Sequence, residues 1–451
     1  MVPTLAVLLL ATAAPLSPPR GIVLVTIDTL RADRVGAYGH PRPTTPFLDR
    51  LAREGVLFEN AFSSAAHTSP AHASLFTGLW PSQHGVRSNG QGFPEPAPDG
   101  YTTLAELLAK AGYDTAAVSA VNFLKPIGRG FRHVDAGGEA RGYRLADRTV
   151  DRALQWLAGK RAGERFFLWL HLYDPHLPTR APEVLRRQFE YATHKATQAY
   201  ADDVVARRPS VKGAYRSPGA LAGRHADYEA EVRFADRELE RMFDAMRRSG
   251  QLRESLFIVT SDHGEGLGDH GYDGHGPFLY DEALRVPLVL WNDGRFAGAR
   301  VPALARHVDL MPTLAEWTGQ KHAAGSFTPQ GRSLLPALRE PDRPLPAAFV
   351  FAQRRPPGPK LRDYEKGEVF ALRDLDFKYL VRTGSRDEMY DLRTDPLEMR
   401  NLADKGTPLA RSLEQRARQA FADSSREGAH AGVGQASPES EEELRALGYI
   451  Q

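Results

Sequence analysis

Three short apolar runs constrain what this chain can fold into. They cover residues 21–27, 166–172 and 256–260, and β-branched and aromatic residues are frequent in them. Runs of this kind are typical of strands buried on both faces, as in a parallel sheet. Segments with helical spacing lie between them. The sequence therefore predicts an α/β fold whose mostly parallel sheet is sandwiched by helices.

The remaining elements continue this alternation. Helices are expected from near Thr45 to just before Gly55, over residues 104–111 and over residues 228–248, where apolar side chains recur on one face. Further strands are expected at residues 115–119 and 286–290. The polar and unpatterned residues 191–223 predict a long surface insertion that could shape a substrate entrance.

Polar residues follow each of the three apolar runs. Asp28 follows the first, Asp174 and His176 follow the second, and Asp262 and His263 follow the third. Sites in open α/β sheets form beyond the carboxyl ends of the strands, so we expect these side chains to converge. Carboxylates and imidazoles bind divalent cations such as Ca²⁺, Mg²⁺, Mn²⁺ or Zn²⁺. Asp28, Asp262 and His263 are therefore the predicted ligands of one such ion.

Residues 67–78 predict a loop that runs into a helix, because Pro70 suits the first helical turn and Gly78 the residue past the last one. Thr68 then lies at the helix N-terminus, where the helix dipole favours bound anions and a deprotonated hydroxyl. A nearby cation would favour that deprotonation further, so Thr68 is the predicted nucleophile and fourth metal ligand. Taken alone, Thr68 could equally be an ordinary helix cap.

Four histidines are candidates for handling the substrate. His72 and His176 are predicted as catalytic residues that steady the anion or the leaving group. His275 and His84 are predicted to bind substrate. The alternative for each of them is an ordinary core or surface histidine, and the step from His84 to Gly85 could be a simple turn.

Composition excludes several classes of protein. The formal net charge of +2 is spread over 451 residues, which gives no electrostatic case for binding nucleic acid. The chain has no cysteine, so disulfides, thiolate metal sites and a cysteine nucleophile are excluded. The apolar and charged fractions, 42% and 25%, are ordinary for a soluble globular protein.

The chain is expected to be exported and to have several parts. Residues 1–19 resemble a secretory signal peptide, with an apolar run too short to span a bilayer, although an anchored or frayed N-terminus is the alternative. No other segment is long and apolar enough for a membrane span, so the mature protein is expected to be soluble. The signal-like residues 1–19 predict that it is exported to the periplasm or outside the cell. Residues 20–340 are the predicted catalytic domain.

A change of composition marks a second unit. Residues 341–427 predict a small C-terminal subdomain with an antiparallel sheet of short strands at 369–373, 377–382 and 388–391, followed by a helix near 409–422. Residues 428–451 predict a flexible linker, up to about residue 441, and a short terminal segment.

The order of these motifs resembles the sulfatases of the alkaline phosphatase superfamily, from Gly21 to about Gly319. The pieces that carry the resemblance are Asp28-Thr29-Leu30-Arg31-Ala32-Asp33, residues 67–78, Pro81-Ser82-Gln83-His84-Gly85-Val86, Asp174-Pro175-His176, Ser261-Asp262-His263-Gly264-Glu265 and His307-Val308-Asp309-Leu310-Met311-Pro312-Thr313. The resemblance implies an alkaline-phosphatase-like sheet with a smaller C-terminal sheet, and hydrolysis of a sulfuric or phosphoric ester.

The chain departs from the family pattern at several positions that carry chemistry. Sulfatases have Cys or Ser, which is converted to formylglycine, where this chain has Thr68, and the Arg of that motif is His72 here. One of the family's paired aspartates is Thr29. The Lys and His expected after the Gly-Tyr-x-Thr motif are also absent, with Ser119-Ala120 and Phe123 in their region. Threonine nucleophiles occur elsewhere in the superfamily, where they transfer phosphoryl groups.

Three functions remain open from the sequence. The first is a metal-dependent hydrolase that cleaves a sulfate or phosphate ester of a small molecule or glycan with Thr68 as nucleophile. The second is a phosphodiesterase or phosphotransferase that acts on a lipid or glycan head group. The third is a catalytically degenerate sulfatase-like binding protein, which the missing Lys and His favour and the intact Asp28, Asp262 and His263 oppose.

Overall fold

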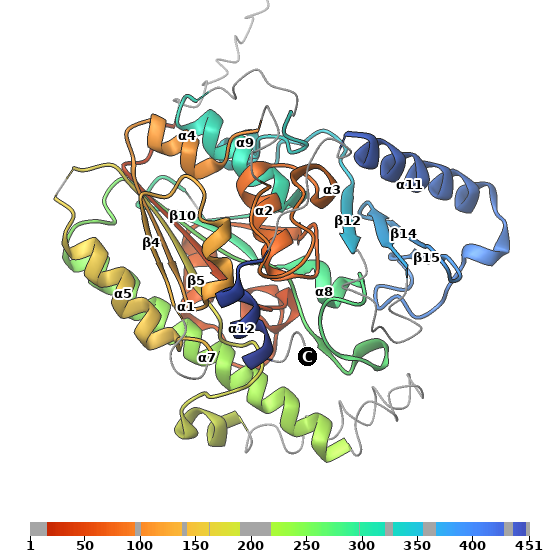
Figure 1. The fold of residues 1–451 in the computed structure, drawn as a ribbon, viewed down its shortest axis with the longest axis horizontal. Helices are drawn as coiled ribbons and strands as arrows, with labels where there is room; N and C mark the ends of the chain where they lie inside the picture. Colours follow the sequence, from red (N-terminus) through yellow and green to blue (C-terminus); the bar gives the residue numbers. More distant parts are fainter. Residues whose placement is uncertain are drawn as a thin grey trace, which may run out of the picture.

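A mixed sheet of nine strands runs through the part of the chain that the structure describes (Figure 1). This computed structural model describes residues 16–94, 101–137, 142–161, 163–189, 218–296, 298–320, 328–354, 367–427 and 436–447. The strands lie in the order β11-β2-β10-β6-β1-β5-β3-β4, and β9 pairs with β2. Their bounds are β1 Gly21–Ile27, β2 Val56–Phe62, β3 Asp114–Ser119, β4 His133–Ala136, β5 Phe166–Leu172, β6 Ser255–Ser261, β9 Arg285–Val286, β10 Leu288–Asn292 and β11 Ala299–Arg306.

The three predicted buried strands are confirmed as the centre of this sheet. β1 lies between β5 and β6 and is parallel to both, with Ile27 level with Leu172 and Ser261. The prediction of one strand at residues 286–290 is wrong in detail, because two strands occupy this region and β10 runs antiparallel to β6. A short apolar run carries no information about direction, which only strand pairing decides.

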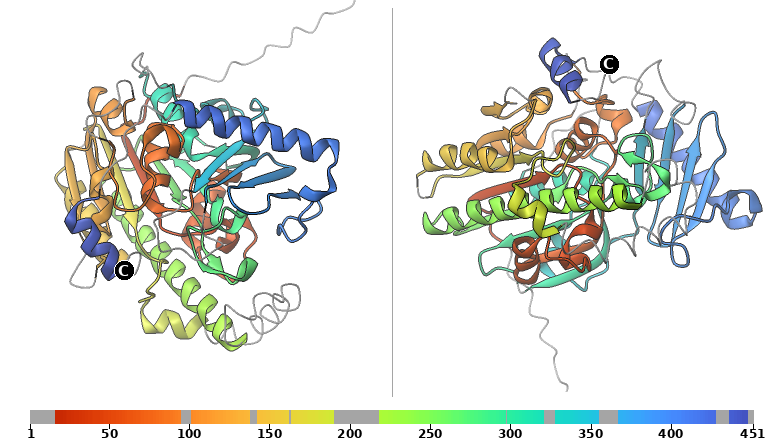
Figure 2. Two further views of the ribbon diagram at one scale, coloured as in Figure 1. Left: turned by 45° about the vertical axis from the view of Figure 1, so that its right-hand side comes forward. Right: turned by 90° about the horizontal axis from the view of Figure 1, so that it is seen from below.

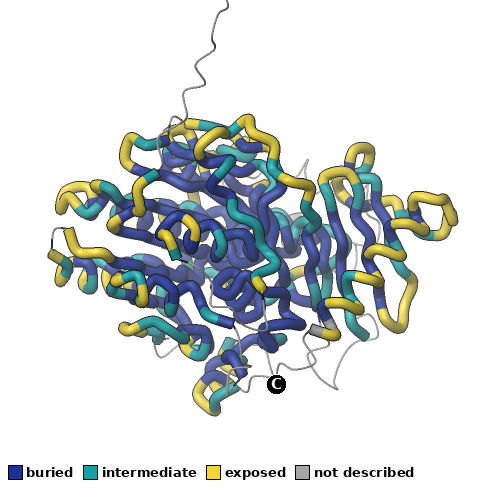
Figure 3. The backbone as a smooth tube through the Cα atoms, turned by 90° about the horizontal axis from the view of Figure 1, so that it is seen from above, coloured by how far each residue is buried: buried dark blue, intermediate teal, exposed yellow. Residues whose placement is uncertain are grey.

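Helices cover both faces of the sheet (Figure 2). Side chains of β1 alternate between these faces, as strand geometry requires. Ile22 and Leu24 belong to a core with α2 (Thr68–Thr77), α4 (Leu104–Lys110) and α9 (His307–Trp317). Val23 and Val25 belong to a second core with α1 (Pro46–Glu54), α5 (Ala146–Ala158) and α7 (Pro218–Arg248). The backbone of the sheet is accordingly buried along most of its length (Figure 3).

Helix α7 is longer than the sequence pattern predicts. It begins at Pro218 rather than near Tyr228, and Leu221 and Ala226 of its first turns are buried. Residues 218–223 of the predicted insertion are therefore helical, and residues 191–217 lie outside the described residues. Polar residues dilute the apolar spacing of these turns, which is why the sequence pattern did not reveal them.

A second, antiparallel sheet follows the main one along the chain. It consists of β12 (Val350–Arg354), β13 (Val369–Arg373), β14 (Phe377–Arg382) and β15 (Glu388–Asp391) in chain order. One face packs against Phe62, Leu279 and Ala283 of the main unit, and α11 (Pro408–Glu427) covers the other. The three predicted strands are confirmed. β12 lies in a stretch rich in Pro and Arg and was not predicted.

Helix α12 (Pro438–Ala446) returns from the end of the chain to the main unit. The Glu443 carboxylate accepts hydrogen bonds from the backbone N–H groups of Asn122 and Phe123, and Leu444 belongs to a core of the main sheet. The expectation of a linker up to residue 441 is therefore wrong from Pro438 onward, because these contacts order the helix. Residues 428–435 and the predicted signal residues 1–15 lie outside the described residues.

The remaining elements are short. They are α3 Pro81–His84, α8 Asp281–Leu284, α10 Leu335–Arg339, β7 Gly266–Leu267, β8 Asp273–Gly274, η1 Ala32–Arg34, η2 Gly36–Tyr38, η3 Asn122–Ile127, η5 Asp269–Gly271 and η7 Ala403–Lys405. Within the described part of the chain, no helix combines the length and hydrophobicity that crossing a membrane requires.

We predict that the buried Lys378 of β14 holds the two units together. Its Nζ lies 3.0 Å from Oδ1 of Asp281 in α8 and 2.7 Å from Oε1 of Glu398. Lys378→Met would leave the buried Glu398 carboxylate without this partner and Asp281 with Arg373 alone, so the free energy of unfolding should fall by about 3–5 kcal/mol in urea denaturation. The control is Arg393→Met, which removes an exposed pair with Asp391 and should change stability little. Equal effects of the two variants would contradict the prediction.

Candidate active site

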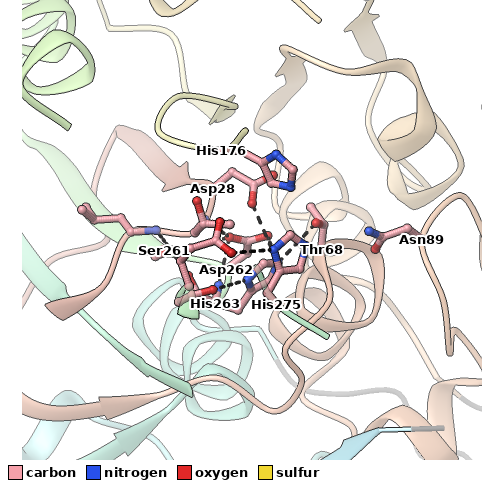
Figure 4. Close-up of polar contacts among 12 residues, drawn as sticks. Asp28, Thr68, Asn89, His176, Ser261, Asp262, His263 and His275 are labelled. Atoms are coloured by element: carbon pink, nitrogen blue, oxygen red, sulfur yellow. Dashed lines mark hydrogen bonds and ion pairs between the residues drawn. The ribbon is translucent and has the colours of Figure 1, made fainter. Parts of the chain in front are cut away.

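The carboxyl ends of β1 and β6 bring three predicted ligands together. Asp28 follows β1, and Asp262 and His263 follow β6, its parallel neighbour. One ligand atom from each of these three buried residues lies within 4.8 Å of the others. Figure 4 shows these side chains gathered at one point beside Thr68. The convergence expected from topology is therefore present for this group.

Three of the four carboxylate oxygens of this group lack a protein hydrogen-bond donor. Both oxygens of Asp28 and Oδ2 of Asp262 are buried without a hydrogen-bond partner. Burial, and then the neighbouring Asp262 carboxylate, raise the pKa of Asp28 well above its usual value. Two adjacent buried carboxylates are costly unless a cation balances them. The donor set therefore fits a divalent cation.

His263 presents the correct nitrogen to this group. Its Nδ1 lies 2.9 Å from the carbonyl oxygen of Gly264, so Nδ1–H donates and the lone pair is on Nε2. Nε2 lies 3.4 Å from Oδ2 of Asp262 and 3.8 Å from Oδ1 of Asp28. A backbone carbonyl that fixes the tautomer in this way is the usual support of a metal-binding histidine.

Thr68 is the first residue of α2, as the sequence predicts, and it is fully buried. Its Oγ1 lies 3.3 Å from Nε2 of His263, so the hydroxyl donates toward that nitrogen. Gly78 ends the helix with φ of 69°, a conformation that glycine adopts without steric cost. The nucleophile candidate thus sits where the N-terminal end of the helix dipole meets the carboxylate group.

Thr29, at a position where the resemblance implies an aspartate, has a strained backbone. Its φ is 56°, an unusual value for a β-branched residue. Its N–H donates to Oδ1 of Asp262 at 3.2 Å, and its carbonyl oxygen accepts from the Tyr228 hydroxyl at 2.7 Å. These bonds hold the turn after β1 in a conformation that orients Asp28 toward Asp262.

Three histidines lie around His263. The ring of His275 is 4.5 Å from that of His263 and 4.9 Å from that of His176, and His67 lies 6.5 Å from His275. Burial, and then the proximity of His275, lower the pKa of both His67 and His176 to about 3. The rings of His67 and His176 are therefore neutral at pH 7. The sequence indicates no role for His67 beyond its place before Thr68, and only the fold brings it here.

Glycine and a carboxylate position the loop that carries His275. Gly276 has φ of 99°, and a Cβ there would lie 2.7 Å from Nε2 of His67, so a larger residue would displace that ring. Nδ1 of His275 lies 3.3 Å from Oε1 of Glu265. Burial acts to raise the pKa of Glu265, but His275 and Arg224 outweigh it and hold that pKa at about 2.

Two predicted residues are not brought to the substrate side. Both ring nitrogens of His72 are engaged inside the protein, Nδ1 with the carbonyl oxygen of Thr68 at 2.8 Å and Nε2 with Oγ1 of Thr26 at 3.0 Å. His84 binds Ser74 through Nε2 and the backbone N–H of Val86 through Nδ1, at 3.0 and 3.1 Å. Spacing along the chain cannot reveal which way a buried imidazole faces.

Asn89 is a site residue that the sequence did not indicate. Its Oδ1 accepts from the backbone N–H of Ser69 at 3.0 Å, so Nδ2 is the remaining donor, and Nδ2 is buried without a partner. The side chain therefore lies beside Thr68 (Figure 4). An asparagine before a glycine is an ordinary turn signal, so its position in the sequence carried no hint of this role.

Comparison with known proteins agrees with this geometry. The family model described as Sulfatase matches residues 20–320. The chain belongs to the sulfatase family. It is 29% identical to the multifunctional alkaline phosphatase superfamily protein PehA of Trinickia caryophylli, over 85% of this chain and 91% of that protein. It is 23% identical to the N-acetylglucosamine-6-O-sulfatase of Bacteroides thetaiotaomicron, over 85% of this chain and 82% of that protein.

Solved structures share the fold of this sulfatase-family chain. The phosphonate monoester hydrolase of Agrobacterium radiobacter superposes with a TM-score of 0.72 at 23% identity, covering 91% of this chain and 96% of that one. The protein BT4656, solved with its substrate D-glucosamine-2-N,6-O-disulfate, gives 0.72 at 21% identity, with 92% and 98% covered. The predicted sheet with a small C-terminal antiparallel sheet is thereby confirmed.

We predict that His84 makes the stability of this sulfatase-family protein depend on pH. Burial lowers the pKa of His84 to about 3, against about 6.5 in an unfolded chain. Between these two pKa values the unfolded state binds more protons than the folded state. The contribution of His84 to the free energy of unfolding is therefore complete above pH 6.5 and is lost as the pH falls. At pH 5 the loss is about 2 kcal/mol.

The variant His84→Gln removes this titration. Urea unfolding at pH 8 and pH 5 should show that the stability difference between wild type and variant shrinks by about 2 kcal/mol at the lower pH. A difference that stayed constant between the two pH values would show that His84 titrates alike in both states.

Proposed function

We propose that this protein is a metal-dependent hydrolase of anionic esters that uses Thr68 as its nucleophile. The observation that carries the proposal is the 3.3 Å approach of the Thr68 hydroxyl to Nε2 of His263, beside two buried carboxylates that have three oxygens without a hydrogen-bond partner. A threonine that only caps a helix needs neither a histidine nor buried carboxylates beside it. Asp28, Asp262, His263 and Thr68 are the proposed ligands of one divalent ion, chosen among Ca²⁺, Mg²⁺, Mn²⁺ and Zn²⁺.

We favour a phosphoric over a sulfuric ester as the substrate. A threonine cannot become formylglycine, so the route that sulfatases use to release sulfate is closed here. Transfer of a phosphoryl group to a hydroxyl and then to water needs no such aldehyde. The relatives include a sulfatase, and the structural neighbours include a phosphonate monoester hydrolase. Both support the wider class of substrate, an ester of a small molecule or glycan.

The residues of this chain would divide the work in two steps. Thr68 Oγ would lose its proton to solvent and form a bond to phosphorus while the bond to the leaving oxygen breaks, and that oxygen takes up a proton from solvent or a bound donor. Water would then break the Thr68–phosphorus bond and restore the hydroxyl. A bound cation would supply charge stabilisation for the deprotonated hydroxyl and the transferred group. The ring of His176, neutral at pH 7, would contact the anion through hydrogen bonds rather than charge.

His275 is proposed as a substrate contact, and His72 and His84 are not. The ring of His275 lies 4.5 Å from that of His263 and 4.9 Å from that of His176, so it contacts both a proposed ligand and a proposed substrate contact. Because the ring nitrogens of His72 and His84 are occupied by protein partners, we assign both of them to supporting the fold around Thr68. Action outside the cytoplasm is also proposed, supported by the signal-like residues 1–19.

The deciding experiment compares three ester classes. Purified protein would be assayed on matched chromogenic sulfate, phosphate monoester and phosphate diester substrates with Ca²⁺, Mn²⁺ and Zn²⁺. We expect phosphate ester turnover that Thr68→Ala abolishes and Thr68→Ser retains in part, because serine keeps the nucleophilic oxygen. Equal rates in the wild type and both variants would show that Thr68 only caps helix α2.

The same assay separates the alternatives. Turnover of the diester alone would favour a phosphodiesterase on a lipid or glycan head group. Sulfate turnover alone would show sulfate release without formylglycine. Inactivity on all substrates, together with purified protein that binds no divalent ion, would favour the degenerate sulfatase-like binding protein.

We predict that Asn89 stabilises charge on the transferred group. Its buried Nδ2 is placed to donate to an anionic oxygen of a group attached to Thr68. Removing one such donor commonly lowers kcat about 100-fold or more. Asn89→Ala should therefore lower kcat by about that factor with a small change in KM. The control is Asn60→Ala, which removes an exposed hydrogen bond to the carbonyl oxygen of Pro302 and should leave kcat unchanged.

A further inference from the structure

A single hydroxyl beneath the site collects contacts from three aromatic rings. Thr26 lies on β1, two residues before Asp28, and is fully buried. Its Oγ1 is 3.0 Å from Nε1 of Trp169, 3.0 Å from Nδ1 of His171 and 3.0 Å from Nε2 of His72. Trp169 and His171 come from β5, and His72 comes from α2. Three elements of the fold thus meet at one oxygen atom.

The partner of the other ring nitrogen of His72 decides which group donates in each of these hydrogen bonds. Nδ1 of His72 faces the carbonyl oxygen of Thr68, so it must donate, and Nε2 of the same neutral ring must accept. The Thr26 hydroxyl therefore donates to His72. Its two lone pairs then accept from Trp169 and from Nδ1–H of His171. A hydroxyl has one donor and two acceptor positions, so Thr26 is fully used.

One arm of this arrangement ends on the proposed site. The His72 arm ends on the carbonyl of Thr68, the first residue of α2. Nε2 of His171 lies 3.4 Å from Oδ2 of Asp28, but with the proton on Nδ1 it carries a lone pair and forms no hydrogen bond with that carboxylate. Thr68 is therefore hydrogen-bonded from behind, through His72, to Thr26 of β1, two residues before Asp28.

The surroundings leave these rings no alternative position. The ring of His72 lies 5.0 Å from that of Trp169 and 4.8 Å from that of His171, which it meets at 90°. All of these side chains are buried, so water does not compete for their hydrogen bonds. A rotation of any one ring would break a bond at Thr26 or a packing contact.

We propose that Thr26 is a positioning residue that, through His72, fixes the position of Thr68 relative to Asp28, which lies two residues further along the chain from Thr26. The inference rests on the proposed function for the roles of these two residues. Supporting groups of this kind usually change metal affinity about 10- to 100-fold when they are removed. Displacing a reacting group by about 1 Å can lower the rate a further 100-fold.

The test uses three variants. Thr26→Val keeps the shape of the side chain and removes the hydroxyl, whereas Thr26→Ser keeps the hydroxyl. Thr115→Val is the matched control, because Thr115 is a fully buried threonine of β3 whose hydroxyl bonds to the carbonyl of Gly130, outside the site. Zn²⁺ and Mn²⁺ affinity would be measured by competition with a chromogenic chelator, and kcat and KM on the best substrate of the ester assay.

We expect Thr26→Val to weaken metal binding about 10- to 100-fold and to lower kcat more than it changes KM. Thr26→Ser should recover most of both quantities, and Thr115→Val should change neither. Folded Thr26→Val protein with wild-type metal affinity and kcat would overturn the proposal.

A third readout separates this inference from the proposed function. Slowly exchanging ring N–H protons of Trp169, His171 and His72 should be visible downfield in proton NMR spectra of wild type and Thr26→Ser. They should shift or disappear in Thr26→Val. If the wild type neither bound metal nor cleaved any ester, the proposed function would fail, whereas unchanged ring protons in Thr26→Val would refute the role of Thr26 itself.

Discussion

The burial of two carboxylates at the ends of adjacent parallel strands is the constraint on which the rest of this structure depends. Asp28 and Asp262 lie side by side without enough protein donors to satisfy their oxygens. In a low-dielectric interior such a pair is unfavourable unless positive charge is placed between them. The strained turn at Thr29 and the fixed tautomer of His263 both serve this arrangement. A protein selected for stability alone would gain nothing from it.

The surrounding units hold the site from three sides. Behind it, the hydroxyl of Thr26 connects the core of β1, β5 and α2. On the substrate side, the loop that carries His275 leads into α8, whose Asp281 is clamped by Lys378 of the small sheet. At a third side, α12 anchors on η3 through Glu443. The C-terminal parts of the chain therefore contribute to the site without supplying a proposed ligand.

The sequence predicted the parts of the fold that depend on local pattern. The strands that end at Ile27, Leu172 and Ser261 were recognisable as short apolar runs, and α2 was recognisable from Pro70 and Gly78. The antiparallel direction of β10 was not recognisable, because the pattern of a buried strand is the same in both directions. Only the first turn of α12, residues 438–441, was predicted as linker, because it is polar and the two side chains that dock, Glu443 and Leu444, come after it.

The sequence by itself determined the chemistry available at the site, because Asp28, Asp262 and His263 follow strands whose carboxyl ends meet at one edge of the sheet, and Thr68 begins a helix. Only the tertiary structure decided which of the histidines face that edge. His275 faces it and His72 faces the core, a difference set by the packing of Thr26 and Trp169 around one ring. Side-chain direction in a buried layer depends on neighbours that are distant in sequence, and local spacing contains no information about them.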